Sequence, residues 1–316
     1  MRAWTLAAVA ACLASPAYAQ DRAIPSGQAL TVPGSTRALG MSNLALDAAD
    51  DAIFYAPSQL VRARGTSGSA EFYDARTWLA TLSTVVPLAG GALGAGVQSL
   101  TYDQPLATTI VVAPGSSAPP SFASALSQAF VVAYAHGAPF RLRIGGAAAL
   151  KSDLGYENER DTRAVFDLGV SRDVPGGVAA LTVQNVGRRM LVNSFAVDLP
   201  MRTTAAYQLE PIPLGVFDIS AVAGVTWNRR RWLNDASGFA AVYQEQWWQP
   251  AGGVDVGYSW LDGYEVHLRG GLRHTGVGDG PYTLGAGISA DRWTLQYAFD
   301  PRQGARAAHR IGVEVH

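Results

Sequence analysis

The sequence predicts an all-β protein, a transmembrane antiparallel β-barrel of about 14 strands with an N-terminal, partly helical plug. Three observations support this fold class. Apolar and polar residues alternate in many short runs, only 16% of the residues are charged, and the one stretch without alternation lies near the N-terminus. A charged fraction well below the roughly 25% of soluble domains indicates a surface that contacts something other than water.

Residues 1–19 have the features of a secretory signal peptide. One cation, Arg2, precedes a short apolar run, and the small-x-small triplet at residues 17–19 follows it. The run is well short of the roughly 20 apolar residues that a spanning helix needs. We therefore expect cleavage after Ala19. A rival cleavage before Cys12 would produce a lipoprotein.

Cysteine content and net charge exclude several classes of function. Cys12 is the only cysteine and leaves with the signal peptide, so an exported chain has no disulfide and no thiol chemistry. The chain has 24 Lys+Arg against 25 Asp+Glu. Because there is no basic excess, nucleic acid is not an expected partner.

The stretch YEVHLRGGLR at residues 264–273 shows the alternation clearly. Leu268 belongs to one set of alternate positions, or parity, which is apolar. His267, Arg269 and Arg273 belong to the other parity. Successive residues of a strand point to opposite faces of the sheet. In a soluble sandwich the apolar face would pack in a protein core. In a membrane barrel it would contact lipid, and the arginines would face the lumen.

The same alternation recurs along the chain, interrupted by turn signals such as VPGG and GDGP. It gives about fourteen runs, many of them near the roughly 9–11 residues that a tilted membrane strand needs. Several runs begin or end in Trp or Tyr on the apolar parity, such as Trp260 and Trp293. Aromatic girdles of membrane barrels lie at such positions. These features favour the membrane barrel over an exported soluble β-protein, which is the alternative.

The opposite parity carries Gly, Ser, Thr, Asp and Arg, which suit a wet or plugged lumen better than a dry core. Charges on this parity need partners inside the lumen. The predicted lumenal polar face includes Arg141, Arg143, Asp167, Asp218, Asp255, His267, Arg269 and Arg273.

Residues 20–66 are predicted to form an N-terminal plug segment, here called the plug, and residues 67–316 the barrel. Within the plug, residues 34–65 mix small and apolar residues at helical spacing. Asp50 and Asp51 stand where they would cap and charge the start of a short helix. No linker or charge run divides the chain further.

The plug sequence RALGMSNLALDAADDAIFYAPSQL resembles the N-terminal signature of the PorV/PorQ-like and FadL-like outer-membrane proteins. That signature is written as Gly-Met-Gly, then Ala-Asp-Asp-Ala, then Asn-Pro-Ala-Gly-Leu. Ser42 stands in place of the second glycine and Ala56 in place of the asparagine. The signature stretch contributes Arg37, Gly40, Met41, Asp50, Asp51, Tyr55 and Pro57 as candidate plug residues.

The segments FDLGVSRDVPGGVAALTVQNVGRRM and HRIGVEVH also resemble the PorV-like branch, so the likeness covers nearly the whole mature chain. The resemblance implies a fourteen-stranded barrel in the outer membrane of a Gram-negative-type bacterium, with the N-terminal segment folded into the lumen. It implies passive transport of small hydrophobic molecules across that membrane. The alternative that it implies is a membrane-embedded shuttle or anchor for secreted proteins, as in type IX secretion. The expected partners are therefore outer-membrane lipid and either a hydrophobic small molecule or a secreted protein.

Charge pairing predicts that the plug lies inside the barrel, with Asp50 and Asp51 directed toward lumenal arginines. The long segments near residues 104–123 and 228–250 could supply either the apolar pocket that a transporter needs or the outward partner surface that a shuttle needs. No paired metal-ligand spacing links the five histidines, and no Gly-x-Ser-x-Gly box is present. Ser194 in VNSF has no histidine nearby in the chain. We therefore expect no enzyme, no catalytic residue, no metal and no cofactor.

Overall fold

The structure is a computed structural model that describes residues 28–32, 34–46, 49–74, 76–105, 122–154, 160–192, 195–234, 241–261, 263–274, 280–301 and 307–315. The predicted signal peptide, residues 1–19, lies outside the described residues. So do Ser194 and most of the segment near residues 104–123.

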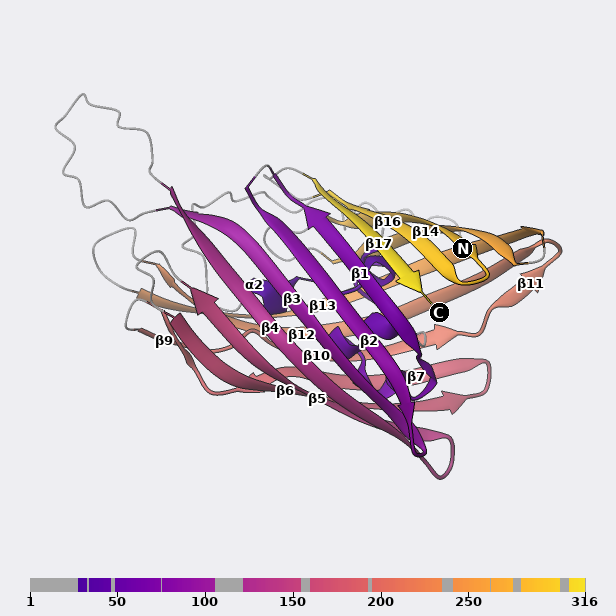
Figure 1. Cartoon of the computed structure of the whole chain (residues 1–316), viewed down its shortest axis with the longest axis horizontal. Coiled ribbons are helices and arrows are strands. Elements are labelled where there is room, and N and C mark those ends of the chain that lie inside the picture. Colours follow the sequence, from indigo (N-terminus) through magenta and orange to yellow (C-terminus); the bar gives the residue numbers. More distant parts are fainter. Residues whose placement is uncertain are drawn as a thin grey trace, which may run out of the picture.

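The described residues form a closed antiparallel barrel (Figure 1). The sheet holds fifteen segments, and β10 and β11 pair with successive parts of β12 as one interrupted strand, which leaves fourteen strands around the ring. β17 pairs with β1 to close the ring. The predicted fold class is confirmed.

The strands of the ring are β1 (Gly65–Phe72), β2 (Trp78–Leu88), β3 (Gly91–Pro105), β4 (Phe122–Ala138), β5 (Leu142–Leu154), β6 (Arg160–Val174), β7 (Gly177–Gly187), β10 (Met201–Leu209) with β11 (Ile212–Leu214), β12 (Phe217–Asn234), β13 (Ala241–Leu261), β14 (Tyr264–Arg273), β15 (Tyr282–Ala290), β16 (Trp293–Asp300) and β17 (Ala308–Val315). A separate hairpin of β8 (Met190–Val192) and β9 (Phe195–Val197) lies between β7 and β10 in the chain.

The connections at the two rims of the barrel differ in length. At the rim with the start of β1 and the end of β17, consecutive strands are joined by two or three residues, as between β2 and β3 or β4 and β5. At the other rim the connections have five residues or more. Outer-membrane barrels have this asymmetry, with short periplasmic turns and longer extracellular loops. We therefore call the two ends the short-turn rim and the long-loop rim.

The segment at residues 228–250, one of the two long segments of the sequence analysis, is mostly strand. β12 and β13 remain paired from Asn228↔Trp247 to Asn234↔Ala241. The two strands extend beyond their neighbours, since the pairing of β12 with β10 ends at Arg229 and that of β13 with β14 ends at Ala251. Only the connection at residues 235–240 lies outside the described residues.

Burial alternates along the strands as the sequence predicts. On β6, Phe166 and Leu168 are 52% and 64% exposed, whereas Val165, Gly169 and Ser171 are buried. In a closed ring the exposed parity is the outer face, so an apolar surface surrounds the barrel. Aromatic residues lie at strand ends on this face, including Trp78, Tyr282 and Trp293.

The plug consists of short helices inside the ring, drawn in indigo in Figure 1. They are α2 (Gln28–Thr31), α3 (Thr36–Gly40), η1 (Asp50–Phe54) and η2 (Pro57–Arg62). α3 lies against β15 and β16, whereas η2 lies against β4 and β5 on the far side of the ring, so the plug crosses the lumen. None of the described helices is long and apolar enough to cross a membrane. The first barrel strand begins at Gly65.

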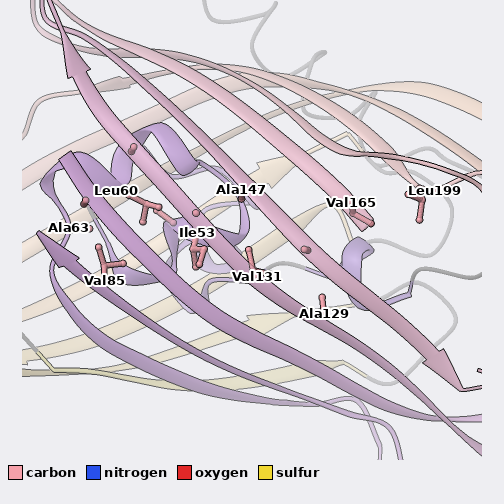
Figure 2. Close-up of a cluster of buried hydrophobic side chains, with 14 of the residues drawn as sticks. Ile53, Leu60, Ala63, Val85, Ala129, Val131, Ala147, Val165 and Leu199 are labelled. Atoms are coloured by element: carbon pink, nitrogen blue, oxygen red, sulfur yellow. The ribbon is translucent and has the colours of Figure 1, made fainter. Parts of the chain in front are cut away.

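A buried apolar cluster joins the plug to the wall (Figure 2). Ile53 and Leu60 of the plug are fully buried and pack with Val85, Val131 and Val165 of the barrel. Burial of one such side chain contributes about 1.5–3 kcal/mol. The cluster therefore contributes to holding η1 and η2 against β2–β6.

Candidate functional site

The wall carries glycines where the backbone of the plug approaches it. A Cβ atom added to Gly253 would lie 2.7 Å from Cβ of Met41. One added to Gly271 would lie 2.4 Å from Oγ and 2.5 Å from the backbone nitrogen of Ser42. Any larger residue at either position would displace the end of α3. Close approach by the plug is therefore one physical reason for glycine in this wall.

Thr283 of β15 binds the turn that follows α3. Its Oγ1 donates to the carbonyl of Gly40 at 3.1 Å and accepts from the backbone nitrogen of Ser42 at 3.0 Å. Ser42 has a φ of 61°, in the left-handed region that favours glycine. This is the position at which the signature has its second glycine. Hydrogen bonding to Thr283 offsets the conformational cost of the serine.

Arg37 of α3 joins the plug to a cluster of charges on β13 and β14. Its Nη2 lies 3.1 Å from Oδ2 of Asp255, and Nε of Arg269 donates to the same oxygen at 3.0 Å. Nδ1 of His267 lies 3.1 Å from the other oxygen, Oδ1. Asp255 and Arg269 are buried. The structure thus brings together one plug residue and three residues of the predicted lumenal face.

Asp50 and Asp51 lie in the first turn of η1, but they do not cap it. The residue at the N-cap is Ala49, which makes no side-chain cap hydrogen bond. Asp51 instead accepts a hydrogen bond from the Tyr55 hydroxyl at 3.4 Å. Burial, followed by the neighbouring charge of Asp51, raises the pKa of Asp50 to about 7. Burial, followed by the charge of Glu314 on β17, also raises the pKa of Asp51.

The prediction that Asp50 and Asp51 pair with lumenal arginines is wrong. Among the described residues, neither carboxylate forms an ion pair with an arginine. The arginine that acts on Asp51 electrostatically is Arg310. Its Nη1 lies 3.2 Å from Oε2 of Glu71, and its Nη2 donates to the carbonyl of Gly34 at 2.9 Å. Arg310 is therefore already held by the wall and the plug backbone.

Pro57 and Arg62 hold the other end of the plug at the short-turn rim. A Cβ atom on Gly145 of β5 would lie 2.4 Å from the carbonyl carbon of Pro57. Arg62 contacts Oδ2 of Asp173 at 2.5 Å, and Arg143 contacts Oδ1 of the same carboxylate at 2.6 Å. The ion pair between Arg62 and Asp173 is an exposed interaction at the rim, since the Arg62 side chain is 54% exposed. Such exposed pairs contribute only about 0–1 kcal/mol.

The remaining predicted lumenal residues occupy different environments. Arg273 is buried and contacts Asp300 of β16. Asp218 is on the inward parity at the start of β12 but is exposed at the short-turn rim. Arg141 does not line the lumen, which corrects the prediction. It lies in the β4–β5 turn with a φ of 59° and an exposed side chain, because the strand begins only at Leu142.

A cavity of about 50 Å³ lies between the plug and the barrel wall. Plug residues from α2, η1 and the chain between α3 and η1 form one side of it, with Leu30, Leu44 and Phe54 among them. Strands β3–β7 and β10 form the other side, where Asp167 and Arg202 contribute polar groups. The cavity is thus bounded partly by a segment that is not one of the hydrogen-bonded strands of the sheet.

A β-bulge beside the cavity places two successive residues of β7 opposite Asp167. The register shifts between Phe166 and Leu168, so Gln184 and Asn185 are both buried. Asn185 donates its backbone nitrogen to Oδ1 of Asp167 at 2.7 Å, with a φ of 60°. The amide of Gln184 donates to the carbonyl of Phe54 in the plug at 2.9 Å. The alternation in the sequence did not reveal the bulge, because a prediction from alternation takes every second residue of a strand to face the same side.

The described residues contain no group of three or more His, Cys, Asp and Glu side chains arranged as a metal site would require. The polar groups of the lumen form ion pairs and hydrogen bonds between the plug and the wall. Such an arrangement can bind a molecule in the lumen, or control whether a molecule enters it.

No family model matches the chain, and no curated protein matches it significantly. Several solved structures are similar to it in fold. The toluene transporter TbuX of Ralstonia pickettii is 11% identical with a TM-score of 0.56, over 89% of this chain and 98% of that one. The toluene transporter TodX of Pseudomonas putida is 8% identical with a TM-score of 0.57, over 89% and 97%. A FadL homologue of Pseudomonas aeruginosa is 9% identical with a TM-score of 0.55, over 93% and 99%.

At these identities the likeness concerns the fold alone. The chain shares the fold of these structures, and in this chain that fold is a fourteen-stranded barrel with an N-terminal segment of short helices. The narrower resemblance to the PorV/PorQ branch stays a prediction.

Proposed function

We propose that this protein is an outer-membrane channel that admits small hydrophobic molecules and is closed by its own plug. The membrane location is supported by the apolar outer face and by the asymmetry of the two rims. The signal peptide expected at residues 1–19 would direct the chain to export. The toluene transporters with the same fold support the class of cargo.

The observation that carries the proposal is the cavity between the plug and the wall. Its volume of about 50 Å³ is smaller than the roughly 150 Å³ of an apolar cavity that binds benzene. This cavity therefore has no room for a monoaromatic molecule while the plug is docked, and in the proposed channel the plug shifts to enlarge it. Polar contacts such as Arg37 to Asp255 and Gln184 to Phe54 would have to break and re-form during each opening.

The alternative is a membrane anchor for secreted proteins, which depends on long outward segments. One of these segments is mostly outside the described residues, and the other is paired as β12 and β13. A channel uses the lumenal cavity and the plug contacts directly, whereas an anchor gives them no role. The channel is therefore the better-supported function, and it requires no enzyme chemistry and no cofactor.

Uptake by intact cells tests the proposal. Cells with an outer membrane would express the full chain or an empty vector, and the initial uptake of a panel of radiolabelled monoaromatic molecules would be measured. We expect at least one molecule of the panel to enter several-fold faster when the chain is present. Equal rates for every member of the panel, with the barrel shown to be folded by heat-modifiable migration on a gel, would exclude the channel.

A further inference from the structure

The wall of the cavity is divided into an apolar part and a polar part. Val131, Ala149 and Val165 are aligned in register across β4, β5 and β6 and form the apolar part. Beyond β6, the polar part begins at the bulge. It contains Asp167 on β6, with Gln184 and Thr182 on β7 in register with Arg202 and Thr204 on β10.

Asp167 and Arg202 place opposite charges in this polar part. They lie within electrostatic range of each other, and Asp167 also accepts the backbone hydrogen bond from Asn185 at 2.7 Å. Both residues belong to strands of the wall, not to the plug. They therefore stay in place when the plug shifts, and any molecule in an enlarged cavity would meet them.

The two charges discriminate between chemical classes of molecule. A carboxylate would be attracted by Arg202 but repelled by Asp167, and an ammonium group would experience the reverse. A hydrocarbon would remove water from both groups without replacing its hydrogen bonds, which is costly. A hydroxyl group donates one hydrogen bond and accepts others, so it can satisfy the carboxylate and the guanidinium together.

We propose that the preferred molecules are small amphiphiles with an apolar body and an uncharged hydroxyl group, selected by Asp167 and Arg202. This inference rests on the proposed channel function and names the class of molecule that the channel prefers. The hydroxyl group binds at the polar part of the wall. The apolar body lies against Val131 and Val165, in space that Leu30 and Phe54 border while the plug is docked.

Four molecules with the same aromatic body test the selection: benzyl alcohol, toluene, benzoate and benzylammonium. Their equilibrium binding to the full chain in lipid vesicles would be measured at neutral pH, with chain-free vesicles as the background. The affinity for benzyl alcohol is expected to exceed that for each of the other three at least tenfold. This factor corresponds to one additional hydrogen bond to a charged group, about 1.4 kcal/mol.

The variant Asp167→Asn identifies the residue responsible. It removes the negative charge but keeps an oxygen that accepts from Asn185. Benzoate affinity should rise at least tenfold relative to benzyl alcohol, because the repulsion is gone while Arg202 remains. The matched control is Leu168→Ala, which changes the neighbouring residue on the lipid face, 64% exposed, and should leave every ratio unchanged.

The outcomes distinguish a failure of the proposed selectivity from a failure of the proposed channel function. If none of the four molecules binds and no member of the uptake panel enters cells faster than with the empty vector, the channel function itself is refuted. If toluene binds as well as benzyl alcohol, the channel stands and the selection by a hydroxyl group is overturned. An unchanged benzoate affinity in folded Asp167→Asn also overturns it. If that variant does not fold, the four affinities of the unmodified chain decide the question.

Discussion

Replacement of Gly271 by alanine tests whether the wall glycines hold the plug in its closed position. Gly271 lies near the end of β14, paired with Gly253 on one side and Thr283 on the other. Its inward face contacts the turn at Met41 and Ser42. The substitution adds a single methyl group at the contact between plug and wall and leaves the outer face of the barrel unchanged.

The size of the effect follows from the distances. The new Cβ would lie 2.5 Å from the backbone nitrogen of Ser42 and 2.7 Å from the carbonyl carbon of Met41, so backbone must move. Overpacking of this kind costs about 1–3 kcal/mol. The cost falls on the docked state alone, because the methyl group meets nothing when the plug has moved away. The population with an undocked plug should therefore rise roughly 5–150-fold.

The assay is single-channel recording in planar bilayers, and Gly270→Ala is the matched control. Gly270 precedes Gly271 in the same strand, and a Cβ there would meet no atom within 4 Å. We expect Gly271→Ala to open far more often than the unmodified chain, whereas Gly270→Ala behaves like it. Equal open probabilities for the two variants would refute the idea that close packing at Gly271 keeps the plug docked.

Three further perturbations test other parts of the structure. Leu268→Arg, on the lipid face in mid-strand, should destabilise the barrel by about 2–4 kcal/mol in urea unfolding, and a polar change at His267 by much less; equal effects would place both faces in a protein core. Deletion of residues 34–60 should leave a folded barrel with higher conductance; unchanged conductance would make the segment an external arm. Since the pKa of Asp50 is about 7 in the docked plug, docking is strongest below about pH 4 and weakens as the pH rises through 7. Open probability should therefore be greater at pH 8 than at pH 5, and Asp50→Asn should reduce this difference; a pH-independent open probability would contradict it.

The fold was predictable because every strand of the wall has the same two environments, so that successive residues face lipid and lumen alternately. Leu268 is 62% exposed and Arg269 is buried, as two neighbours on opposite faces of a membrane strand should be. Parity does not reveal where a strand starts, and this explains the misplaced Arg141 in the turn at the short-turn rim. A bulge shifts the parity by one residue, and for that reason the inward position of Asn185 did not follow from the pattern.

The contacts of the candidate site were less predictable, because they join residues that are far apart in the chain. Arg310 and Glu71 are 239 positions apart, and only the closure of the barrel brings β17 beside β1. With Arg310 held there, no ion pair is left for Asp51, although charge balance alone had suggested one. The acceptor for Arg37 is likewise fixed by the height at which α3 lies in the lumen, which the sequence pattern does not determine.

The central claim is that movement of the plug controls passage through the barrel, and a reversible cross-link tests it most directly. Oγ of Ser42 and Oγ1 of Thr283 are 3.4 Å apart, and the only natural cysteine, Cys12, lies in the predicted signal peptide. The double variant Ser42→Cys, Thr283→Cys should therefore form a disulfide between plug and wall. Uptake of monoaromatic molecules should fall to the empty-vector rate when the double variant is oxidised and recover on reduction. Uptake by each single variant should be the same under oxidising and reducing conditions. If the oxidised protein, with its disulfide verified by mass spectrometry, takes up these molecules as fast as the unmodified chain, the plug does not control passage.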